Sequence, residues 1–177
     1  MKPYKKINSC RVCKKKKKLR LVVDLNEQYI QGSFIKKNYP TTYTKKIPLQ
    51  LVICENCGLL QANYSVSPKI LYKNYWYSSG INKTMRNHLK DLSLKSLKLL
   101  NNYNLSKEKI NILDIGCNDG TLLSFYPKQS NKFGIDPSQI AKRIKAKNTK
   151  IINDFFPSKK LLNVAANNKF NLITSIA

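Results

Sequence analysis

The chain has 177 residues, of which 42% are hydrophobic, so it can form one medium-sized domain or two small ones with packed cores. No apolar run approaches the roughly 18 residues that cross a bilayer, and no apolar stretch follows the basic amino terminus. We therefore expect neither a membrane span nor a signal peptide. This favours a cytoplasmic protein, in which paired cysteines bind metal more readily than they form disulfides.

The formal net charge of +24 raises the question of nucleic-acid binding. However, 29 of the 33 basic residues are lysine, and the chain also holds 20 asparagines, a bias that A/T-rich codons produce. Surfaces that clamp phosphates or read bases favour the bidentate arginine fork, which this chain nearly lacks. We therefore favour a compositional origin for the charge and expect no nucleic-acid partner, although the run Lys14 to Lys18 would attract any polyanion.

Two cysteine pairs mark the first expected segment, residues 1–75. Cys10 and Cys13 form one pair, and Cys54 and Cys57 form the other. Two intervening residues let both sulfurs of a pair reach one tetrahedral zinc ion at about 2.3 Å. Four thiolates leave no open position on the metal, which predicts a structural zinc site rather than a catalytic one. Reduced structural cysteines or a redox pair are the alternatives.

The chain between the cysteine pairs is longer than a simple zinc ribbon needs. Forty residues separate Cys13 from Cys54, against a usual spacing of about 15–20. We therefore expect a small subdomain between the pairs. Its predicted elements, with those that follow the second pair, are strands at 19–25, 47–53 and 59–64 and a short helix at 68–72.

Residues 76–105 are expected to link the zinc module to the next domain. Tyr75, Trp76 and Tyr77 precede a helix predicted from residue 82 to about 101, because its apolar residues recur near the 3.6-residue period. The aromatics suit either interdomain packing or the wall of a substrate pocket. His88, the single histidine, is a candidate general base, although a lone helical histidine more often lies on the surface or in packing.

The stretch from Ile110 to Gly120 predicts the first unit of a nucleotide-binding α/β sheet. An apolar strand ends near Asp114, and the turn from Gly116 to Gly120 opens a helix. The glycines permit positive φ, close ligand approach and tight helix packing. Asp136 closes the next expected strand, where a carboxylate can bind both ribose hydroxyls. The third glycine of a pyrophosphate-binding loop is missing, which disfavours a dinucleotide.

The remaining pattern predicts a parallel sheet with helices. The expected elements are strands at 110–115, 132–136, 150–152 and 170–177 and helices at 120–126, 137–147 and 160–167. Asp154 and Phe155 follow the third strand and suit either adenine binding or ordinary packing. The predicted fold class is α/β: a small zinc-binding module followed, over residues 106–177, by a Rossmann-like sheet that looks incomplete. A tight strand–turn–helix in some other α/β protein is the alternative.

In combination, these motifs resemble the sugar C-methyltransferase family. The spacing from Asp114 to Gly120 looks like motif I of class I S-adenosylmethionine (SAM) methyltransferases. The cysteine pairs, the stretch from Tyr75 to Gly80, the stretch from Thr84 to His88 and the stretch from Gly134 to Ser138 are similar to that family in the same order. The resemblance runs from about Cys10 to the last residue.

The resemblance implies SAM-dependent methylation of a carbon on a nucleotide-linked deoxy-keto sugar, with zinc at the four cysteines. The residues expected at SAM are Asp114, Gly116, Cys117, Asn118, Asp119, Gly120, Asp136, Pro137, Asp154 and Phe155. The Cys117 thiol is expected to fill space rather than act as a ligand or nucleophile. Family members continue with roughly as much chain again, where their proton-abstracting histidine lies, so the sequence looks like an amino-terminal fragment of doubtful activity.

Methylation of a carbon beside a keto group needs a base that removes a proton and a group that stabilises the enolate. Tyr75, Tyr77 and His88 are the candidates within this sequence. The expected partner is a small molecule, a sugar nucleotide. Two other functions stay open: a zinc-ribbon RNA binder or RNA methyltransferase, and a remnant that binds zinc or SAM without turnover.

Overall fold

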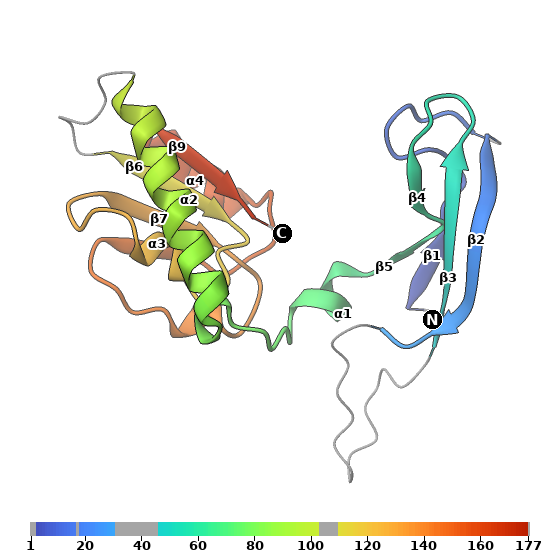
Figure 1. The fold of residues 1–177 in the computed structure, drawn as a ribbon, viewed down its shortest axis with the longest axis horizontal. Coiled ribbons are helices and arrows are strands. Elements are labelled where there is room, and N and C mark those ends of the chain that lie inside the picture. The colour runs from blue at the N-terminus through green and yellow to red at the C-terminus, as the bar shows by residue number, and fades with distance from the viewer. Residues whose placement is uncertain (1–2, 17, 31–45, 103–109, 177) are drawn as a thin grey trace, which may run out of the picture. The chain divides into compact units, whose positions relative to one another are not determined.

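The structure, a computed structural model, describes residues 3–16, 18–30, 46–102 and 110–176. The chain forms two compact units, Met1–Tyr72 and Lys73–Ala177 (Figure 1). The first unit carries antiparallel strands and a four-cysteine cluster, and the second carries a four-stranded parallel sheet. This mixed α/β architecture agrees with the predicted fold class and with a partial Rossmann-like fold. The division at residue 75 stays a prediction, and the one at 105 lies outside the described residues.

Two small antiparallel sheets form the first unit. In one, β1 (Tyr4–Lys6) pairs with β5 (Tyr64–Val66). In the other, β3 (Ile47–Cys54) lies between β2 (Leu19–Gln28) and β4 (Leu60–Ala62). The apolar, β-branched runs in β2 and β3 explain why these two strands could be predicted. β1 is three residues long and two of them are lysine, so its sequence has no alternating apolar pattern from which a strand could be predicted.

The strand predicted at 59–64 is interrupted at Asn63. The backbone N–H of Asn63 donates to the carbonyl oxygen of Gln50 at 2.8 Å, and its side-chain amide donates to Gln50 Oε1 at 2.8 Å. These bonds anchor the bend at which the chain leaves β4 and begins β5. The short helix that follows, α1 (Pro68–Tyr72), begins and ends where the sequence predicts.

The second unit is built on a parallel sheet with the strand order β8-β7-β6-β9. Its strands are β6 (Asn111–Ile115), β7 (Asn131–Ile135), β8 (Thr149–Ile152) and β9 (Leu172–Ser175). In chain order this arrangement is 3-2-1-4, which matches the start of the doubly wound Rossmann order. The register sets Asp114 beside Gly134 on one side and Thr174 on the other. The loops after β6 and β7 therefore leave the sheet side by side.

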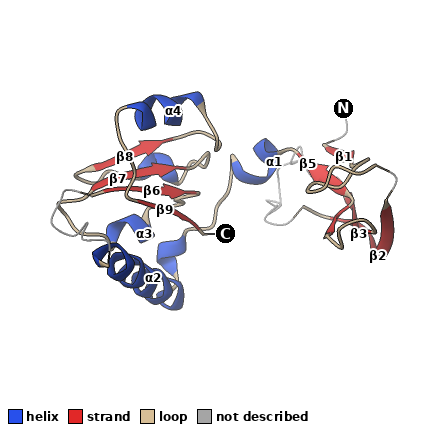
Figure 2. Ribbon diagram, turned by 90° about the horizontal axis from the view of Figure 1, so that it is seen from above, coloured by secondary structure: helices blue, strands red, loops and turns tan. Residues whose placement is uncertain are grey.

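Helices cover both faces of this sheet. Figure 2 shows α2 (Lys83–Asn101) and α3 (Thr121–Ser124) on one face and α4 (Lys159–Ala166) on the other. α2 begins where predicted, because Asn82 Oδ1 accepts the N–H groups of Thr84 and Met85. None of the helices in the described ranges is long and apolar enough to cross a membrane.

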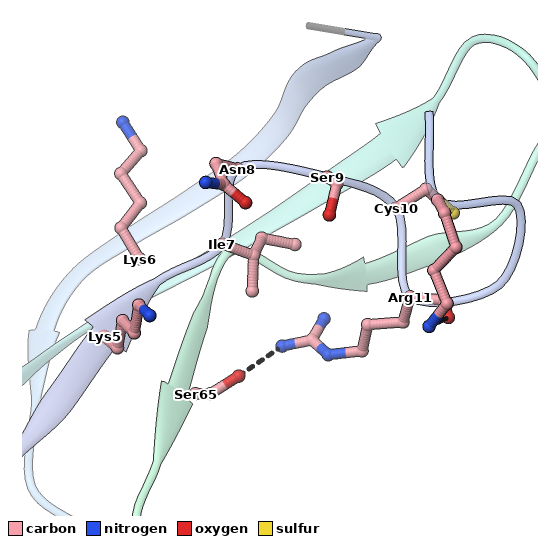
Figure 3. Close-up of a pocket in the computed structure, with 9 residues that line it drawn as sticks. Lys5, Lys6, Ile7, Asn8, Ser9, Cys10, Arg11 and Ser65 are labelled. Atoms are coloured by element: carbon pink, nitrogen blue, oxygen red, sulfur yellow. Dashed lines mark hydrogen bonds between the residues drawn. The ribbon is translucent and has the colours of Figure 1, made fainter. Parts of the chain in front are cut away.

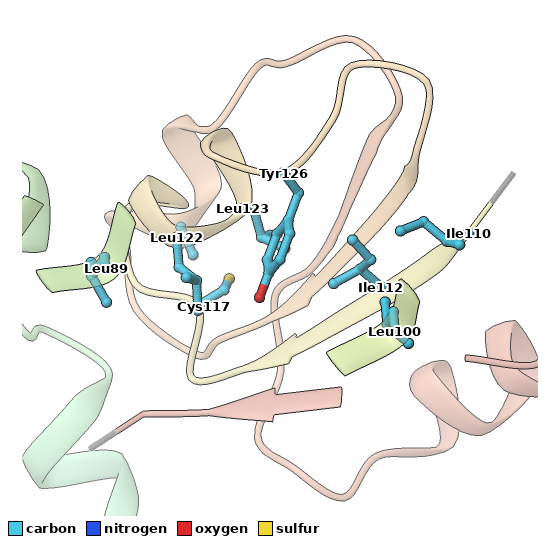
Figure 4. Close-up of a cluster of buried hydrophobic side chains, with 9 residues drawn as sticks. Leu89, Leu100, Ile110, Ile112, Cys117, Leu122, Leu123 and Tyr126 are labelled. Carbon is cyan, nitrogen blue, oxygen red and sulfur yellow. The ribbon is translucent and has the colours of Figure 1, made fainter. Parts of the chain in front are cut away.

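Two buried clusters make up the core of the second unit. Successive strand residues point to opposite faces, so Ile112 serves one cluster and Leu113 serves the other. The larger cluster joins α2, β6 and α3 (Figure 4) through Leu89, Leu100, Ile110, Ile112, Cys117, Leu122, Leu123, Tyr126 and Ala141. Each fully buried Leu or Ile side chain contributes about 1.5–3 kcal/mol. This packing holds the sheet rigidly beneath the loops at its carboxyl edge.

The prediction of a helix at 137–147 is wrong. Only a short 3-10 turn, η3 (Ala141–Arg143), forms there. The segment carries four cations and no acid, so helical i,i+4 pairs such as Arg143 and Lys147 would set like charges together. Pro137 fits a helix start, but this signal does not compensate for the missing charge pairs.

Candidate metal centre and cofactor loop

Four cysteines from the two ends of the first unit converge on one point. The Sγ atoms of Cys10, Cys13, Cys54 and Cys57 all lie within 4.8 Å of one another. The Cys10–Cys57 sulfurs are 3.7 Å apart, and the Cys13–Cys54 sulfurs are 3.6 Å apart. A tetrahedral zinc ion with bonds of about 2.3 Å separates its sulfurs by about 3.8 Å. These distances fit one four-thiolate zinc ion and are far longer than a disulfide bond of about 2.05 Å.

Local backbone turns present the sulfurs of each pair to a common centre. In the first pair, the N–H of Lys14 donates to the Cys10 carbonyl oxygen at 3.1 Å. In the second, the N–H of Gly58 donates to the Cys54 carbonyl oxygen at 2.8 Å, with a Gly58 φ of +73° that glycine adopts without strain. The β2–β3 pairing then brings the pairs together, because it sets Leu19 directly opposite Cys54.

Hydrogen bonds favour the thiolate form in part of this cluster. Burial opposes ionisation of Cys10, but N–H groups of Cys13 and Val12 and the Gln61 amide, 3.4 Å from Sγ, lower its pKa to about 6. At Cys57 the N–H of Leu59 favours the thiolate, yet burial and the neighbouring thiols raise the pKa to about 11. Four crowded thiolates repel one another, and a divalent cation at their centre would hold all four deprotonated. The donor set therefore fits zinc.

The glycine loop joins β6 to α3 at the carboxyl edge of the parallel sheet. The N–H of Gly116 donates to the Ile135 carbonyl oxygen at 2.8 Å, and Gly116 and Gly120 both adopt a φ of +76°. Among the described residues, no atom lies within 4 Å of the point where Gly116 would carry a Cβ, whereas a Cβ on Gly120 would lie 3.0 Å from Ile144. Gly120 thus allows close packing, and Gly116 leaves open space in front of the loop.

Asp136 follows β7 directly and fastens the loop to it. Its Oδ2 accepts the N–H of Asn118 at 2.9 Å, and its Oδ1 accepts the N–H of Ser138 at 2.8 Å. The residue is only 8% exposed. A carboxylate has about four lone-pair positions, so Asp136 keeps acceptor capacity beyond these two bonds.

Asp114 lies below the loop, on β6, and is 3% exposed. Burial raises the pKa of Asp114 to about 6, and the nearby Asp136 carboxylate adds to this rise. The Thr174 hydroxyl, which donates to Oδ1 at 2.7 Å, opposes it. The adjoining strand ends therefore bring two acids close together.

Cys117 packs against Gly134 beside these two acids. Burial is the main cause that raises the pKa of its thiol, and the negative charges of the acids raise it further. The thiol therefore stays protonated and fills space without reacting.

Residues 75–80, here called the aromatic strap, are held by Asp119. Asp119 Oδ2 accepts the hydroxyl of Ser78 and the N–H of Gly80, the latter at 2.7 Å. Its Oδ1 accepts the N–H and the hydroxyl of Thr121 at 3.0 and 2.6 Å. Burial opposes ionisation of Asp119, but these hydrogen bonds outweigh it and lower the pKa. A Cβ on Gly80 would lie 2.7 Å from Thr121 Oγ1, so the strap approaches this closely only with glycine there.

Asn118 makes a second set of bonds to the aromatic strap. Its Oδ1 accepts the N–H of Ser79 at 3.0 Å, and its Nδ2 donates to the Tyr77 carbonyl oxygen at 2.8 Å. Asn118 adopts a φ of +49°, a conformation that asparagine tolerates better than most residues. Since its N–H also binds Asp136, one residue connects the strap, the glycine loop and the end of β7.

Other candidate residues lie farther from this network. His88 lies on the exposed side of α2, and no hydrogen bond or ion pair recorded for the described residues joins it to the glycine loop. Asp154 and Phe155 are half-buried after β8, where Asp154 Oδ1 accepts the N–H of Phe155 at 2.9 Å. Pro137 is half-buried next to Asp136. The roles of these residues at a cofactor or substrate stay predictions.

Two polar residues that shape the site, Asn153 and Thr174, were not predicted from the sequence. Asn153 Nδ2 donates to the carbonyl oxygens of Asp136 and Ser138 at 2.8 and 2.9 Å, and so ties the loops after β7 and β8 together. Thr174 holds the carboxylate of Asp114. Both are polar residues at or near the carboxyl end of a strand of the parallel sheet, and this position is the signal that could have identified them.

Comparison with known families is informative for the first unit. Residues 10–72 match the family model Methyltransf_13, which describes a zinc-binding domain. All four cysteines of the metal centre lie within this match. The first unit is thus similar to a zinc-binding domain that the name of the family model associates with methyltransferases. No curated protein matches the sequence.

Proposed function

We propose that this chain carries the cofactor-binding part of a SAM-dependent methyltransferase, which methylates a carbon of a nucleotide-linked deoxy-keto sugar. The observation that carries the proposal is the bond from the Asn118 N–H to Asp136, which joins the glycine loop to the acid at the end of the neighbouring strand. Open space in front of Gly116 and spare acceptor capacity on Asp136 suit the ribose of such a cofactor. The methyltransferase-associated zinc module supports the same reading.

Each part of the site has a role in this proposal. SAM supplies a methyl group on a positively charged sulfur. Asp136 accepts the ribose hydroxyls, and the glycine loop passes close to the methionine end of the cofactor. Two acids, Asp114 and Asp136, make the local potential negative, which suits a sulfonium cation. The zinc ion holds the first unit together and takes no part in the chemistry, because four thiolates leave it no open position.

The aromatic strap is the proposed acceptor side. Asn118 and Asp119 hold it against the glycine loop, so an acceptor on Tyr75 or Tyr77 would lie beside the methyl donor. The two tyrosine rings meet edge to face with centroids 6.4 Å apart. A tyrosine hydroxyl can hydrogen-bond a sugar or stabilise an enolate oxygen. The keto-sugar acceptor is the most specific part of the proposal and rests on the resemblance of the ordered motifs.

The first test is SAM binding to the zinc-loaded protein by isothermal titration calorimetry. Asp136→Asn should weaken SAM by about tenfold or more, because it replaces charge-assisted bonds to the ribose. Asp24→Asn removes the same charge from an exposed strand of the first unit and should leave the affinity unchanged. Wild-type protein that binds no SAM, or equal effects of the two changes, would contradict the proposal.

The acceptor is tested separately, in a methyl-transfer assay with the zinc-loaded protein. Transfer of labelled methyl groups from SAM should be seen with nucleotide-linked keto sugars and not with the same sugars reduced to alcohols, since only the ketone acidifies the neighbouring C–H bond. Tyr77→Phe should lower the rate of transfer without changing SAM affinity. A rate unaffected by Tyr77→Phe would argue against a role for this hydroxyl.

A further inference from the structure

A basic pocket beside the first cysteine pair contains none of the residues assigned to methyl transfer. It has a volume of about 290 Å³ and lies wholly within the first unit (Figure 3). Lys5, Lys6, Arg11 and Lys14 contribute four positive charges to its lining. Among the described residues that line it, none carries a carboxylate. The pocket is therefore a concave concentration of positive charge.

Arg11 is fixed in place by uncharged acceptors. Its Nη1 donates to Gln61 Oε1 at 3.3 Å and to the Ala62 carbonyl oxygen at 2.6 Å, and its Nη2 donates to Ser65 Oγ at 2.9 Å. Figure 3 shows the side chain reaching across the pocket to Ser65. Of the five N–H donors of a guanidinium, these bonds use three and leave two. Arg11 is thus a preorganised cation whose charge no acid in these contacts neutralises.

Further donors of the pocket are also available. The side chains of Asn8 and Ser9 have no recorded hydrogen-bond partner among the residues that the structure describes. Ser65 Oγ accepts a bond from Arg11, so its own proton can be donated to a ligand. A fixed arginine fork, lysine ammonium groups and hydroxyl or amide donors are the groups that bind phosphate oxygens.

Neutralisation of the metal centre is a competing explanation for these charges. A zinc ion with four thiolates carries a net charge of −2, and cations nearby would stabilise it. However, four basic side chains line the pocket. The side-chain hydrogen bond that the buried Cys10 sulfur receives from a residue outside the cluster comes from the neutral Gln61 amide and not from one of these cations. In the described part of the first unit, the one recorded ion pair is Arg20 with Glu55, at 3.6 Å. Positive charge therefore remains for a ligand.

We propose that this pocket binds a phosphate-type oxyanion, with a diphosphate as the ligand class. Its volume equals that of about ten water molecules, which admits two linked phosphate groups. SAM carries no phosphate, so the ligand is distinct from the proposed methyl donor. The proposed acceptor, a nucleotide-linked sugar, does carry such a group, but the charge of this pocket favours a phosphate ligand whether or not methyl transfer occurs. The same chemistry is present in a free nucleoside diphosphate group and in an RNA backbone. A pocket of only about 290 Å³ around one fixed arginine favours the free diphosphate, because an RNA backbone would extend far beyond it.

Titration of the zinc-loaded full chain with inorganic pyrophosphate tests the site, by calorimetry at low ionic strength. Arg11→Lys keeps the charge but removes the fork, and should weaken pyrophosphate about tenfold. The double change Lys5→Gln with Lys6→Gln alters only exposed side chains and should weaken it several-fold, in the manner of lost charge-assisted bonds. Lys90→Gln with Lys98→Gln, on exposed positions of α2, removes the same charge from the second unit and should have no effect.

Zinc content of each variant shows whether the module is intact. Pyrophosphate that fails to bind wild-type protein, or that is weakened equally by the α2 control, would overturn the proposal, since diffuse charge would then explain the attraction. Single-stranded RNA then distinguishes the sources. RNA that displaces pyrophosphate and loses affinity with Arg11→Lys would identify a nucleic-acid backbone as the ligand of this site. Pyrophosphate binding that RNA does not displace would support the free diphosphate.

Discussion

The two units of this protein are stabilised in different ways. In the described part of the first unit, the buried apolar side chains are Cys10, Ile30, Val52 and Cys54, and two of these are proposed metal ligands. The ten residues of β2 are exposed or half-buried throughout. The second unit, in contrast, has two apolar clusters on the two faces of its sheet. A small module without a substantial core needs another source of stability, and zinc at the four thiolates supplies it.

Zinc removal is expected to have the largest effect and to separate the units most clearly. Structural zinc contributes about 10–16 kcal/mol to the folding of small modules. Chelation, or Cys54→Ser, should therefore abolish amide-exchange protection in the first unit while the second keeps its protection. Hydrogen exchange read by mass spectrometry measures both units in one sample.

Cys117→Ala is the matched control for the zinc experiment. Cys117 is buried against Gly134 in the second unit and is not one of the four cysteines of the metal cluster. This variant should keep one zinc per chain and full protection of the first unit. Reduced wild-type protein with much less than one zinc per chain, or a first unit that stays protected after chelation, would refute a metal-dependent module.

Core truncation should produce the opposite pattern. Leu123 is 1% exposed in the cluster that joins α2, β6 and α3. Leu123→Ala should lower the free energy of unfolding of the second unit by about 2–5 kcal/mol, through lost burial and the cavity left behind. Urea unfolding followed by hydrogen exchange of the β6 and α3 amides reports on the core of this unit.

Leu94→Ala, at a position 55% exposed on α2, should change the same free energy by less than about 0.5 kcal/mol. Zinc content should not change in either variant. Loss of zinc from Leu123→Ala would show that the units depend on each other for folding and are not stabilised independently.

The units should also respond to acid in opposite directions. Burial raises the pKa of Asp114 from 3.8 to about 6, so the folded second unit binds a proton more tightly than the unfolded chain. Its stability should therefore fall as the pH rises from about 4 to about 6, by up to about 3 kcal/mol. The first unit should instead lose zinc as the pH falls, because protons compete with the metal for thiolates.

Asp114→Asn isolates the contribution of this carboxyl. The asparagine can still accept the Thr174 hydroxyl bond, but it does not titrate. The stability of the second unit, measured by urea unfolding between pH 4 and 7.5, should then lose most of its decline with pH. An identical decline in wild type and variant would assign the pH dependence to other groups.

The sequence predicted the parts of this protein in which local pattern and tertiary environment agree. Apolar runs located the strands β3, β6 and β7, and the paired cysteines located the metal cluster, because each signal is contained in a few consecutive residues. The helix expected at 137–147 does not form, because the prediction considered the helix-start signal and ignored the repulsion between like charges along the segment. The bonds from Asn118 and Asp119 to the strap join residues about forty positions apart, and no local pattern encodes that separation.

The smallest expected effect concerns the aromatic strap, which lies at the edge of the second unit rather than in its core. Asp119→Asn keeps the size of the side chain but removes the charge that Ser78, Gly80 and Thr121 contact. Loss of these charge-assisted bonds should cost about 1–3 kcal/mol, mostly as local opening of the strap. Opening of the strap should expose Trp76 beyond the 53% seen in the structure. Acrylamide should therefore quench its fluorescence more efficiently in the variant.

Asp91→Asn, which removes an exposed acid whose ion pair with Lys95 is worth only about 0.3–0.5 kcal/mol, should leave the quenching of Trp76 unchanged. If Asp119→Asn also leaves it unchanged, the strap is held by other contacts and Asp119 does not position it. If quenching rises while the urea midpoint of the second unit stays close to wild type, the strap opens independently of the core. The protein would then have three parts: a first unit stabilised by metal, a second-unit core stabilised by apolar packing, and a weakly held strap. The strap is the element proposed to face the substrate.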